Sequence, residues 1–378
     1  MPTTQFSFIA HPSGNESWTV VSDFLSDVAG TWRVGATVLL SRYKESTSRR
    51  HAAAFEPNAL FVIADPESQK LELPFAQRGR GRDDLAYLQE SSPAANVTRF
   101  VSNVLQAQID NGREILISPW LVHGATPNTR SLHTTLSCAR AAAASPLAND
   151  HQLWFGFQIT HNVVSADKER NDFLNELVEL PAKPIYLRIQ IEPPDGPRQF
   201  ADEAVIRGLR EVVSALSDNG MPVVIAQAGL LGWLMLPFGA KSFGAGTRMS
   251  MQRTVAPSPG FARQPLNWFF VPQFLGCALA EEMPQIAAVS GYQPCTCPYC
   301  DGNLPDTGDD FDREAAGKHY LWWCARLANE LIPVQPLTAL RQRIGDSESF
   351  WNQVQRSSVV LDDRSHPLHL ASWLAAVS

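Results

Sequence analysis

The sequence has no long apolar run and carries few charges for its length. No stretch approaches the ~20 consecutive apolar residues that a membrane-spanning helix needs. The opening MPTTQFSFIAHPSGNE lacks the basic start and the apolar stretch of a signal peptide. Of the 378 residues, 18% are charged and 44% are hydrophobic, which is typical of a folded chain rather than a disordered one. We expect a cytoplasmic protein that does not associate with a membrane.

Positive charge is also scarce. The formal net charge is -7, so the chain as a whole has no electrostatic reason to bind a polyanion. Contact with nucleic acid would need a local basic surface. Two segments qualify, residues 42–50 (RYKESTSRR) and 77–82 (QRGRGR), although solvated loops often have the same composition. The sequence also has no Gly-x-Ser-x-Gly motif, so nothing supports a serine hydrolase of that type.

Cysteine is rare, yet half of it is concentrated in one place. Three of the six cysteines, Cys295, Cys297 and Cys300, lie within the sequence CTCPYC, where Pro298 favours a tight turn. With so few cysteines and no secretory leader, a disulfide is the weaker interpretation. Closely spaced thiolates are soft ligands that favour tetrahedral Zn²⁺ over hard cations. We therefore predict a zinc site.

The sequence offers two candidates for the fourth zinc ligand, His319 and Cys324, and we favour His319. A histidine near the start of a helix is often only a surface residue, and Cys324 lies in an apolar helical stretch where a thiol is often core packing. Three cysteines and one further protein ligand would fill the shell of the ion. The predicted zinc is therefore structural rather than catalytic, because a catalytic zinc keeps one position for water.

Short apolar runs alternate with longer amphipathic segments through most of the chain. The runs are continuous rather than alternating, which indicates strands that are buried on both faces, as in a parallel sheet. Repeated strand–helix units favour an α/β fold, either a (β/α)8 TIM-type barrel or an open doubly wound sheet. The predicted strands are residues 59–64, 114–118, 153–159, 184–191, 222–226 and 242–246, and the predicted helices are 97–110, 130–144, 168–180 and 201–218.

These patterns suggest three regions. We expect residues 1–55 to be an appended N-terminal segment and residues 56–332 to be the barrel. The zinc-binding subdomain, residues 290–330, would be a late insertion in the barrel. Residues 333–378 would be a helical extension that carries little chemistry.

Polar residues follow several predicted strands at their carboxyl ends, where a parallel barrel holds its reacting groups. Asp65 and Glu192 are the available carboxylates, and Gln158 and Gln227 are amides that could bond the edge of a flat heterocycle. Chemistry at an anomeric carbon needs such a carboxylate nearby. The simpler interpretation is that these residues only cap strands. After the strand at 242–246, Arg248 or Arg253 could neutralise a phosphate held by backbone N–H groups.

The order of these motifs resembles the tRNA-guanine transglycosylase family, zinc-bearing (β/α)8 barrels that exchange a base in nucleic acid. Cys295, Cys297 and Cys300 match the sulfur part of the zinc signature of that family, and the sequence YLWW at 320–323 stands where the family has a helix that begins with Tyr-Leu. Gln158, after FGF, looks like the residue that holds the base. Asp65, after VIA, looks like an early strand-end aspartate of the family. The likeness covers roughly residues 55–332.

Several positions depart from the family pattern. The position of the nucleophilic aspartate is Gly244 here, and glycine cannot form a glycosyl–enzyme bond. The family has Asp-Ser-Gly-Gly where this chain has DPES at 65–68, and its second base-reading aspartate is replaced near Pro119 and Trp120. Its Gly-Gly pair beside the base is not visible at residues 188–192. Its zinc histidine lies further downstream than His319.

Two hypotheses follow. In the first, the chain is a nucleobase transglycosylase acting on a guanine-like base in tRNA or DNA, with Asp65 or Glu192 as nucleophile or general base. In the second, it keeps the scaffold without the chemistry and serves as a base- or nucleic-acid-binding module, a partner subunit or a homodimer. The second is favoured by Gly244 and could use an apolar docking face formed by late aromatic residues: Trp268, Phe269, Phe270, Phe274, Trp322 and Trp323. Ordinary core packing is the more usual role of such residues.

Overall fold

A computed structural model describes most of the chain. The described residues are 7–12, 17–42, 44–72, 85–89, 93–124, 129–191, 199–247, 254–255, 266–332 and 335–378. Among them, no helix is both long and apolar enough to span a bilayer.

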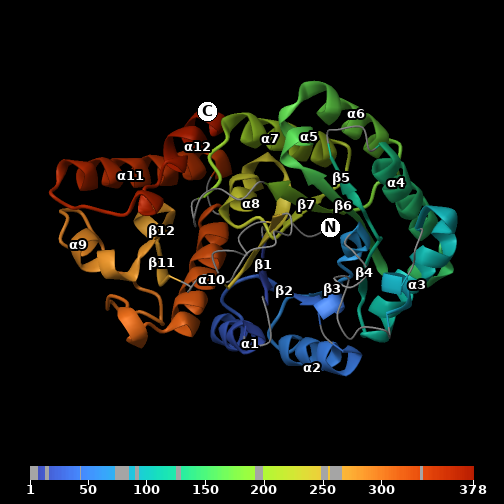
Figure 1. Ribbon diagram of the computed structural model, residues 1–378, viewed down its shortest axis with the longest axis horizontal. Helices are drawn as coiled ribbons and strands as arrows, with labels where there is room; N and C mark the ends of the chain where they lie inside the picture. The colour runs from blue at the N-terminus through green and yellow to red at the C-terminus, as the bar shows by residue number, and fades with distance from the viewer. Residues whose placement is uncertain are drawn as a thin grey trace.

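Eight parallel strands form a nearly closed barrel (Figure 1). Neighbouring strands follow the order β3-β2-β1-β9-β8-β7-β6-β4, and β3 and β4, at the two ends of this path, contact each other. This is the (β/α)8 TIM-type architecture that the strand–helix pattern predicts. The eight strands are β1 (Ser7–His11), β2 (Val34–Leu39), β3 (Val62–Asp65), β4 (Ile115–Ile117), β6 (Gln152–Thr160), β7 (Ile185–Ile191), β8 (Val223–Ala226) and β9 (Ala240–Gly246). Two short strands, β5 (Val122–His123) and β10 (Thr254–Val255), add to β6 and β7.

The helices surround the barrel and begin where their sequences provide caps. Asn96 accepts a hydrogen bond from the backbone N–H of Arg99 at the start of α3, and Asp202 accepts one from Val205 at the start of α7. The surrounding helices are α1 (Ser17–Val28), α2 (Glu45–Phe55), α3 (Val97–Asp110), α4 (Thr129–Ala143), α5 (His161–Ser165), α6 (Asp167–Val178), α7 (Glu203–Asp218), α8 (Leu230–Leu234) and α10 (Arg313–Glu330). Because α10 contacts both α1 and β1, it covers the first strand and completes the ring.

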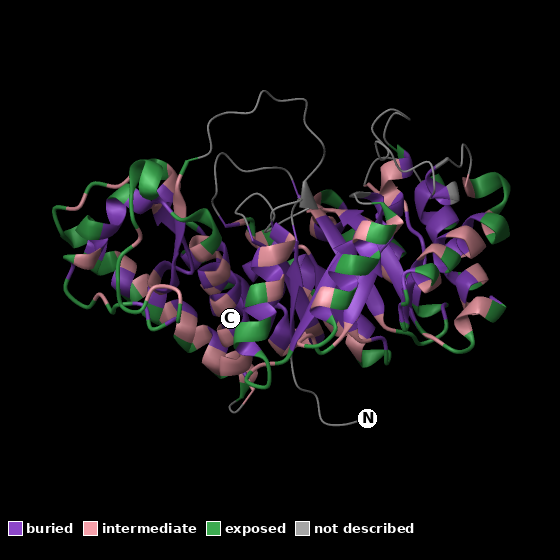
Figure 2. Ribbon diagram, turned by 90° about the horizontal axis from the view of Figure 1, so that it is seen from below, coloured by how far each residue is buried: buried purple, intermediate pink, exposed green. Residues whose placement is uncertain are grey.

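The strands are buried on both faces, as the continuous apolar runs predict (Figure 2). Alternate residues point outward to the helices and inward to the centre of the barrel. The inward residues form a core cluster of their own that consists of Ile9, Ile63, Ile115, Ile117, Trp120, Trp154, Tyr186, Val224 and Ala226. Aromatic rings thus fill much of the centre.

Three inward glycines make room for these rings. A Cβ atom at Gly35 would lie 2.6 Å from the ring of Phe61, and one at Gly156 would lie 2.2 Å from the ring of Trp120. A Cβ at Gly244 would lie 2.3 Å from Nε2 of His11. Such distances are far below van der Waals contact, so only glycine fits at these positions while the rings keep their places.

The boundary predicted at residue 55 is wrong. Strand β1 pairs with both β2 and β9, so residues 7–55 supply the first two strand–helix units of the barrel instead of an appended segment. The pattern is hard to find in the sequence because β1 places polar Ser7 and His11 on the inward face, which breaks up its apolar run.

The late insertion lies between β9 and α10 and extends further than predicted. Its described part from residue 266 contains an antiparallel hairpin, β11 (Trp268–Val271) and β12 (Gly276–Leu279), followed by the short helix α9 (Met283–Ala287) and the cysteine segment. The C-terminal helices are α11 (Pro336–Arg356) and α12 (His369–Val377). Phe350 and Val354 of α11 join the core of the insertion. The C-terminal region is therefore structurally tied to the insertion (Figure 1).

The aromatic residues proposed as a docking face are mostly core residues. Phe269, Phe270, Phe274 and Trp323 are buried, and the side chains of Trp268 and Trp322 are half-buried against the core. These residues therefore provide packing rather than a free apolar surface.

Candidate metal centre and barrel mouth

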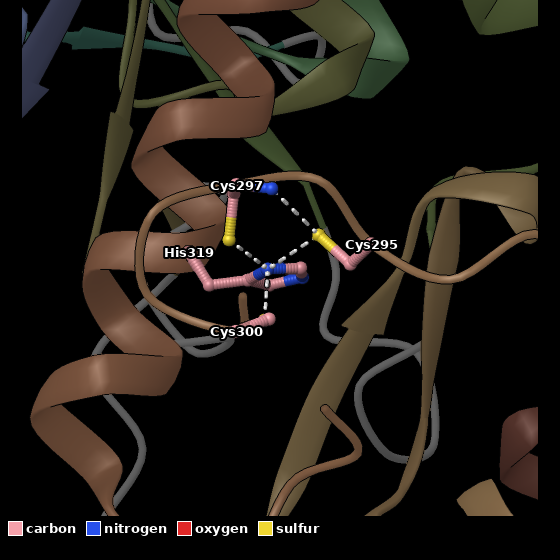
Figure 3. A group of neighbouring side chains, drawn as sticks. All are labelled: Cys295, Cys297, Cys300 and His319. Carbon is pink, nitrogen blue, oxygen red and sulfur yellow. Dashed lines mark hydrogen bonds between the residues drawn. The ribbon is translucent and has the colours of Figure 1, made fainter. Parts of the chain in front are cut away.

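Four side chains of the insertion and of α10 converge on one point (Figure 3). Their potential ligand atoms, the sulfurs of Cys295, Cys297 and Cys300 and a ring nitrogen of His319, all lie within 4.8 Å of one another. The three sulfurs lie 3.6, 3.3 and 3.2 Å from Nδ1 of His319. These atoms can hold one metal ion, and the set consists of the three predicted cysteines with His319, the favoured fourth ligand.

Backbone hydrogen bonds shape the cysteine segment into a knuckle. The N–H groups of Cys300 and Asp301 donate to the carbonyl of Cys297, and the N–H of Gly302 donates to that of Cys295. Asp301 and Gly302 both have positive φ, of 45° and 80°, which turns the chain back sharply. The turn brings three thiols from six residues to the same side.

Contacts around His319 fix which of its nitrogens faces the sulfurs. Nε2 lies 2.8 Å from the carbonyl oxygen of Phe270 and can donate its proton there, which leaves the lone pair of Nδ1 for a metal. The ring of Phe269 stacks on the imidazole with 4.3 Å between centroids. Trp323 donates to the sulfur of Cys295 at 3.3 Å. The predicted alternative ligand, Cys324, is buried outside the cluster.

The cluster attracts positive charge. Hydrogen bonds with Cys297 and Cys300 lower the pKa of Cys295 far below that of an ordinary thiol. Burial lowers the pKa of His319, but hydrogen bonds with Cys295 and Cys297 outweigh this effect and raise it to about 9. A proton and a metal cation therefore compete for the same buried, electron-rich position.

A second polar cluster lies inside the barrel at the carboxyl ends of the strands. Asp65 at the end of β3 forms an ion pair with Arg188 of β7, and Tyr186 donates a hydrogen bond to the same carboxylate at 2.7 Å. All three side chains are almost completely buried. Burial and then the charge of Asp65 raise the pKa of the Tyr186 hydroxyl well above its usual value, so it stays a proton donor. Burial lowers the pKa of Arg188, but Asp65, Tyr186 and Glu67 together outweigh this effect and raise it, so Arg188 stays charged.

The carboxylate of Asp65 is fully engaged. Its other oxygen accepts a hydrogen bond of 2.8 Å from the N–H of Glu67, within a tight turn in which Glu67 has a φ of 48°. Gln227, directly after β8, also has a positive φ, of 50°. Non-glycine residues rarely adopt this conformation, and such strain gathers at functional sites. Both residues stand at the same end of the barrel.

Gln158 points into the same interior as Asp65. Its amide nitrogen donates to Gln190 at 3.0 Å. The side chain is 3% exposed, and its buried Oε1 atom has no hydrogen-bond partner among the described residues. Within the described part of the chain, the side-chain Nε of Arg188 and the indole N–H of Trp120 are also buried without partners. The interior of the barrel thus holds unused donors and an unused acceptor.

The structure brings only some of the predicted mouth residues together. Asp65 and Gln158 share the barrel interior, and the N–H of Gln227 lies near Gly244, although no hydrogen bond joins its side chain to Gln158 in the described part of the chain. Glu192, Arg248 and Arg253 lie outside the described residues. Their predicted roles stay predictions.

Sequence reasoning missed three residues of this site: His11, Tyr186 and Arg188. The signal for the last two was present, because YLRIQ at 186–190 alternates polar and apolar residues with a period of two. Tyr186 and Arg188 lie within the strand rather than at its carboxyl end, where reacting groups were expected. His11 was missed because its strand was not recognised.

Comparisons with known proteins do not assign this chain to a family. No family model matches the chain, and no curated protein matches it. One solved structure, a protein from Burkholderia cenocepacia described as a lyase/mutase, has 14% identity and a TM-score of 0.37, with 64% of this chain and 77% of that chain covered. Another, phospho-2-dehydro-3-deoxyheptonate aldolase from Thermotoga maritima, has 10% identity and a TM-score of 0.33, with 67% and 65% covered. At such low similarity, the activities of these proteins say nothing about this chain.

Proposed function

We propose that this chain is a base-recognition barrel that resembles the tRNA-guanine transglycosylases. It binds a guanine-like base, free or within tRNA or DNA, at the carboxyl ends of its strands. The observation that carries the proposal is the amide of Gln158, which is buried inside the barrel and whose oxygen has no partner among the residues that the structure describes. A buried polar atom without a partner costs about 1–3 kcal/mol, and an N–H group of a bound base would remove that cost.

We further propose that the ion held by the cysteine cluster is Zn²⁺ with a structural role. Three thiolates and one imidazole are a ligand set typical of structural zinc, and four protein ligands leave no position for a catalytic water. Cys295, Cys297 and Cys300 come from the insertion, whereas His319 belongs to the helix that covers β1. Bound zinc would fasten the insertion to the barrel.

Binding without base exchange is favoured by the surroundings of two residues. The family nucleophile position is Gly244, and the ring of His11 fills the space beside it. The carboxylate that ends β3, Asp65, is already bonded by Arg188 and Tyr186. A carboxylate held by a cation and two further donors is a weak nucleophile and a weak base.

Base exchange is the second candidate, and the position of Asp65 supports it. Asp65 ends β3 at the side of the barrel where the reacting groups of such folds stand. Exchange at an anomeric carbon would require Arg188 to release this carboxylate when the substrate enters, or would require Glu192.

A binding assay and an exchange assay with the same samples separate the two candidates. Radiolabelled guanine is added to the purified protein, alone and with tRNA or DNA, and both retained label and incorporated label are counted. We expect retention without incorporation. The variant Gln158→Met keeps the side-chain volume but removes the amide, and should weaken retention about tenfold or more, whereas the surface control Gln106→Met should not.

Incorporation of label that disappears in Asp65→Asn, in protein that keeps its fold and zinc, would establish exchange instead. Absence of any guanine binding, with and without nucleic acid, would remove the proposal.

A further inference from the structure

Arg188 is a buried cation that the sequence patterns did not single out. It lies in the middle of β7, faces the barrel interior, and is only 2% exposed. One end of its guanidinium is paired with Asp65, while its Nε lacks a hydrogen-bond partner in the part of the chain that the structure describes. Its guanidinium carbon lies 5.7 Å from the ring centroid of Trp120. The guanidinium is thus held from two sides and retains an unused donor.

The unused acceptor of Gln158 belongs to the neighbouring strand at the same level. Gln158 and Arg188 are paired residues in the parallel register of β6 and β7. Both side chains face the interior, because Gly156 and Tyr186, two residues before them, border Trp120 there. An N–H donor and a carbonyl acceptor therefore stand on adjacent strands of one wall.

We infer that Arg188 is a specificity-determining residue that reads the carbonyl group of a lactam edge. This inference rests on the proposed base binding. The Nε–H of Arg188 donates to a ring carbonyl oxygen, and the adjacent ring N–H donates to Oε1 of Gln158. Guanine and hypoxanthine present this edge as a carbonyl beside a ring N–H. Hydrogen bonds from a charged donor are stronger than neutral ones, so the carbonyl contact carries most of the discrimination.

Asp65 and Tyr186 are positioning residues in this arrangement. Their hydrogen bonds occupy the far end of the guanidinium and fix its direction. The ion pair also balances the charge of Arg188. The surface formed by Arg188 and Gln158 therefore suits a neutral ring better than an anionic group such as phosphate.

The test compares guanine with 2-aminopurine, which lacks both the carbonyl oxygen and the ring proton. Binding constants are measured for the wild type and for Arg188→Lys. Lysine keeps a positive charge for Asp65 but places a methylene group where Nε stands. We expect the wild type to bind guanine about 30-fold more tightly than 2-aminopurine, and Arg188→Lys to reduce this preference to about threefold. The matched control is Arg113→Lys, another buried and ion-paired arginine, which should keep the preference.

A second variant covers the case in which Arg188→Lys does not fold. Asp65→Asn combined with Arg188→Met removes both charges together and should show the same loss of preference. Equal binding of guanine and 2-aminopurine by the wild type, or a preference that both Arg188 variants keep, would overturn the role of Arg188 while leaving base binding in place. If the wild type binds neither base, the proposed function itself fails.

Discussion

The imidazole of His11 occupies the space that a side chain at residue 244 would need. Nε2 of His11 would lie 2.3 Å from a Cβ atom built on Gly244, and both residues face the interior of the barrel from paired strands. His11 is completely buried, so its ring has little room to move aside. The absence of a side chain at 244 is therefore part of the packing of the barrel.

This contact predicts that residue 244 does not tolerate substitution. Gly244→Ala should lower the free energy of unfolding by about 1–3 kcal/mol because the added methyl group overpacks the core. Gly244→Asp should cost more, since it also buries a carboxylate, and it should not create exchange activity. Denaturant unfolding checks the stability, and label incorporation checks the activity. Gly345→Ala is the matched control, because that position in α11 is open and alanine favours a helix. Equal stability of Gly244→Ala and wild type would contradict the packing described here.

The buried pair of Asp65 and Arg188 predicts strong coupling between the two residues. Removing one partner leaves an uncompensated charge inside the barrel, so Asp65→Asn or Arg188→Met alone should destabilise the protein by about 3–5 kcal/mol. The double variant should recover a large part of this loss. Urea unfolding of the four proteins in a double-mutant cycle gives the coupling energy. Additive effects of the two substitutions would mean that the charges are not paired in solution.

The metal centre predicts one ion for each chain and a specific dependence on His319. His319→Ala and Cys297→Ser should lose the metal and unfold at a lower temperature, because the insertion is then no longer fastened to α10. Cys324→Ser should still bind one metal ion for each chain, since Cys324 lies outside the cluster. Metal analysis of the purified variants, together with thermal unfolding, measures both effects. Metal retained by His319→Ala but lost from Cys324→Ser would reverse the assignment of the fourth ligand.

Two buried histidines predict a loss of stability in mild acid. Burial lowers the pKa of His369 to about 3 and that of His51 to about 4 from an ordinary value of 6.5. Below pH 6.5 the unfolded chain takes up protons at both histidines while the folded chain does not. The free energy of unfolding should therefore be insensitive to these groups above pH 6.5. It should fall between pH 6.5 and 4 by about 1.4 kcal/mol per pH unit for each histidine.

Denaturant unfolding at several pH values checks this expectation. His369→Gln should reduce the slope of the unfolding free energy against pH by about 1.4 kcal/mol per pH unit, which corresponds to one proton. The variant His133→Gln, at an exposed histidine, controls for the substitution itself. A slope that is unchanged in His369→Gln would show that His369 takes up its proton in the folded state.

Much of the barrel could be predicted because its strands carry local signals. Residues 97–110 coincide with α3, and the six predicted strands all overlap strands of the barrel. The first two units could not be predicted in the same way. Inward positions of β1 hold Ser7 and His11, which gain their burial only when β9 closes the barrel beside them. Burial of this kind depends on residues more than 200 positions away and leaves no local pattern.

The chain itself determined the sulfur ligands of the metal centre and the alternation of strands and helices, because both depend on neighbours a few residues apart. Tertiary structure alone decided that His319, and not Cys324, meets the sulfurs, since the choice depends on which side of α10 faces the knuckle. It also decided that Arg188 pairs with Asp65, because a contact between residues 123 positions apart arises only when the strands curve into a closed wall and bring their inward side chains to one axis.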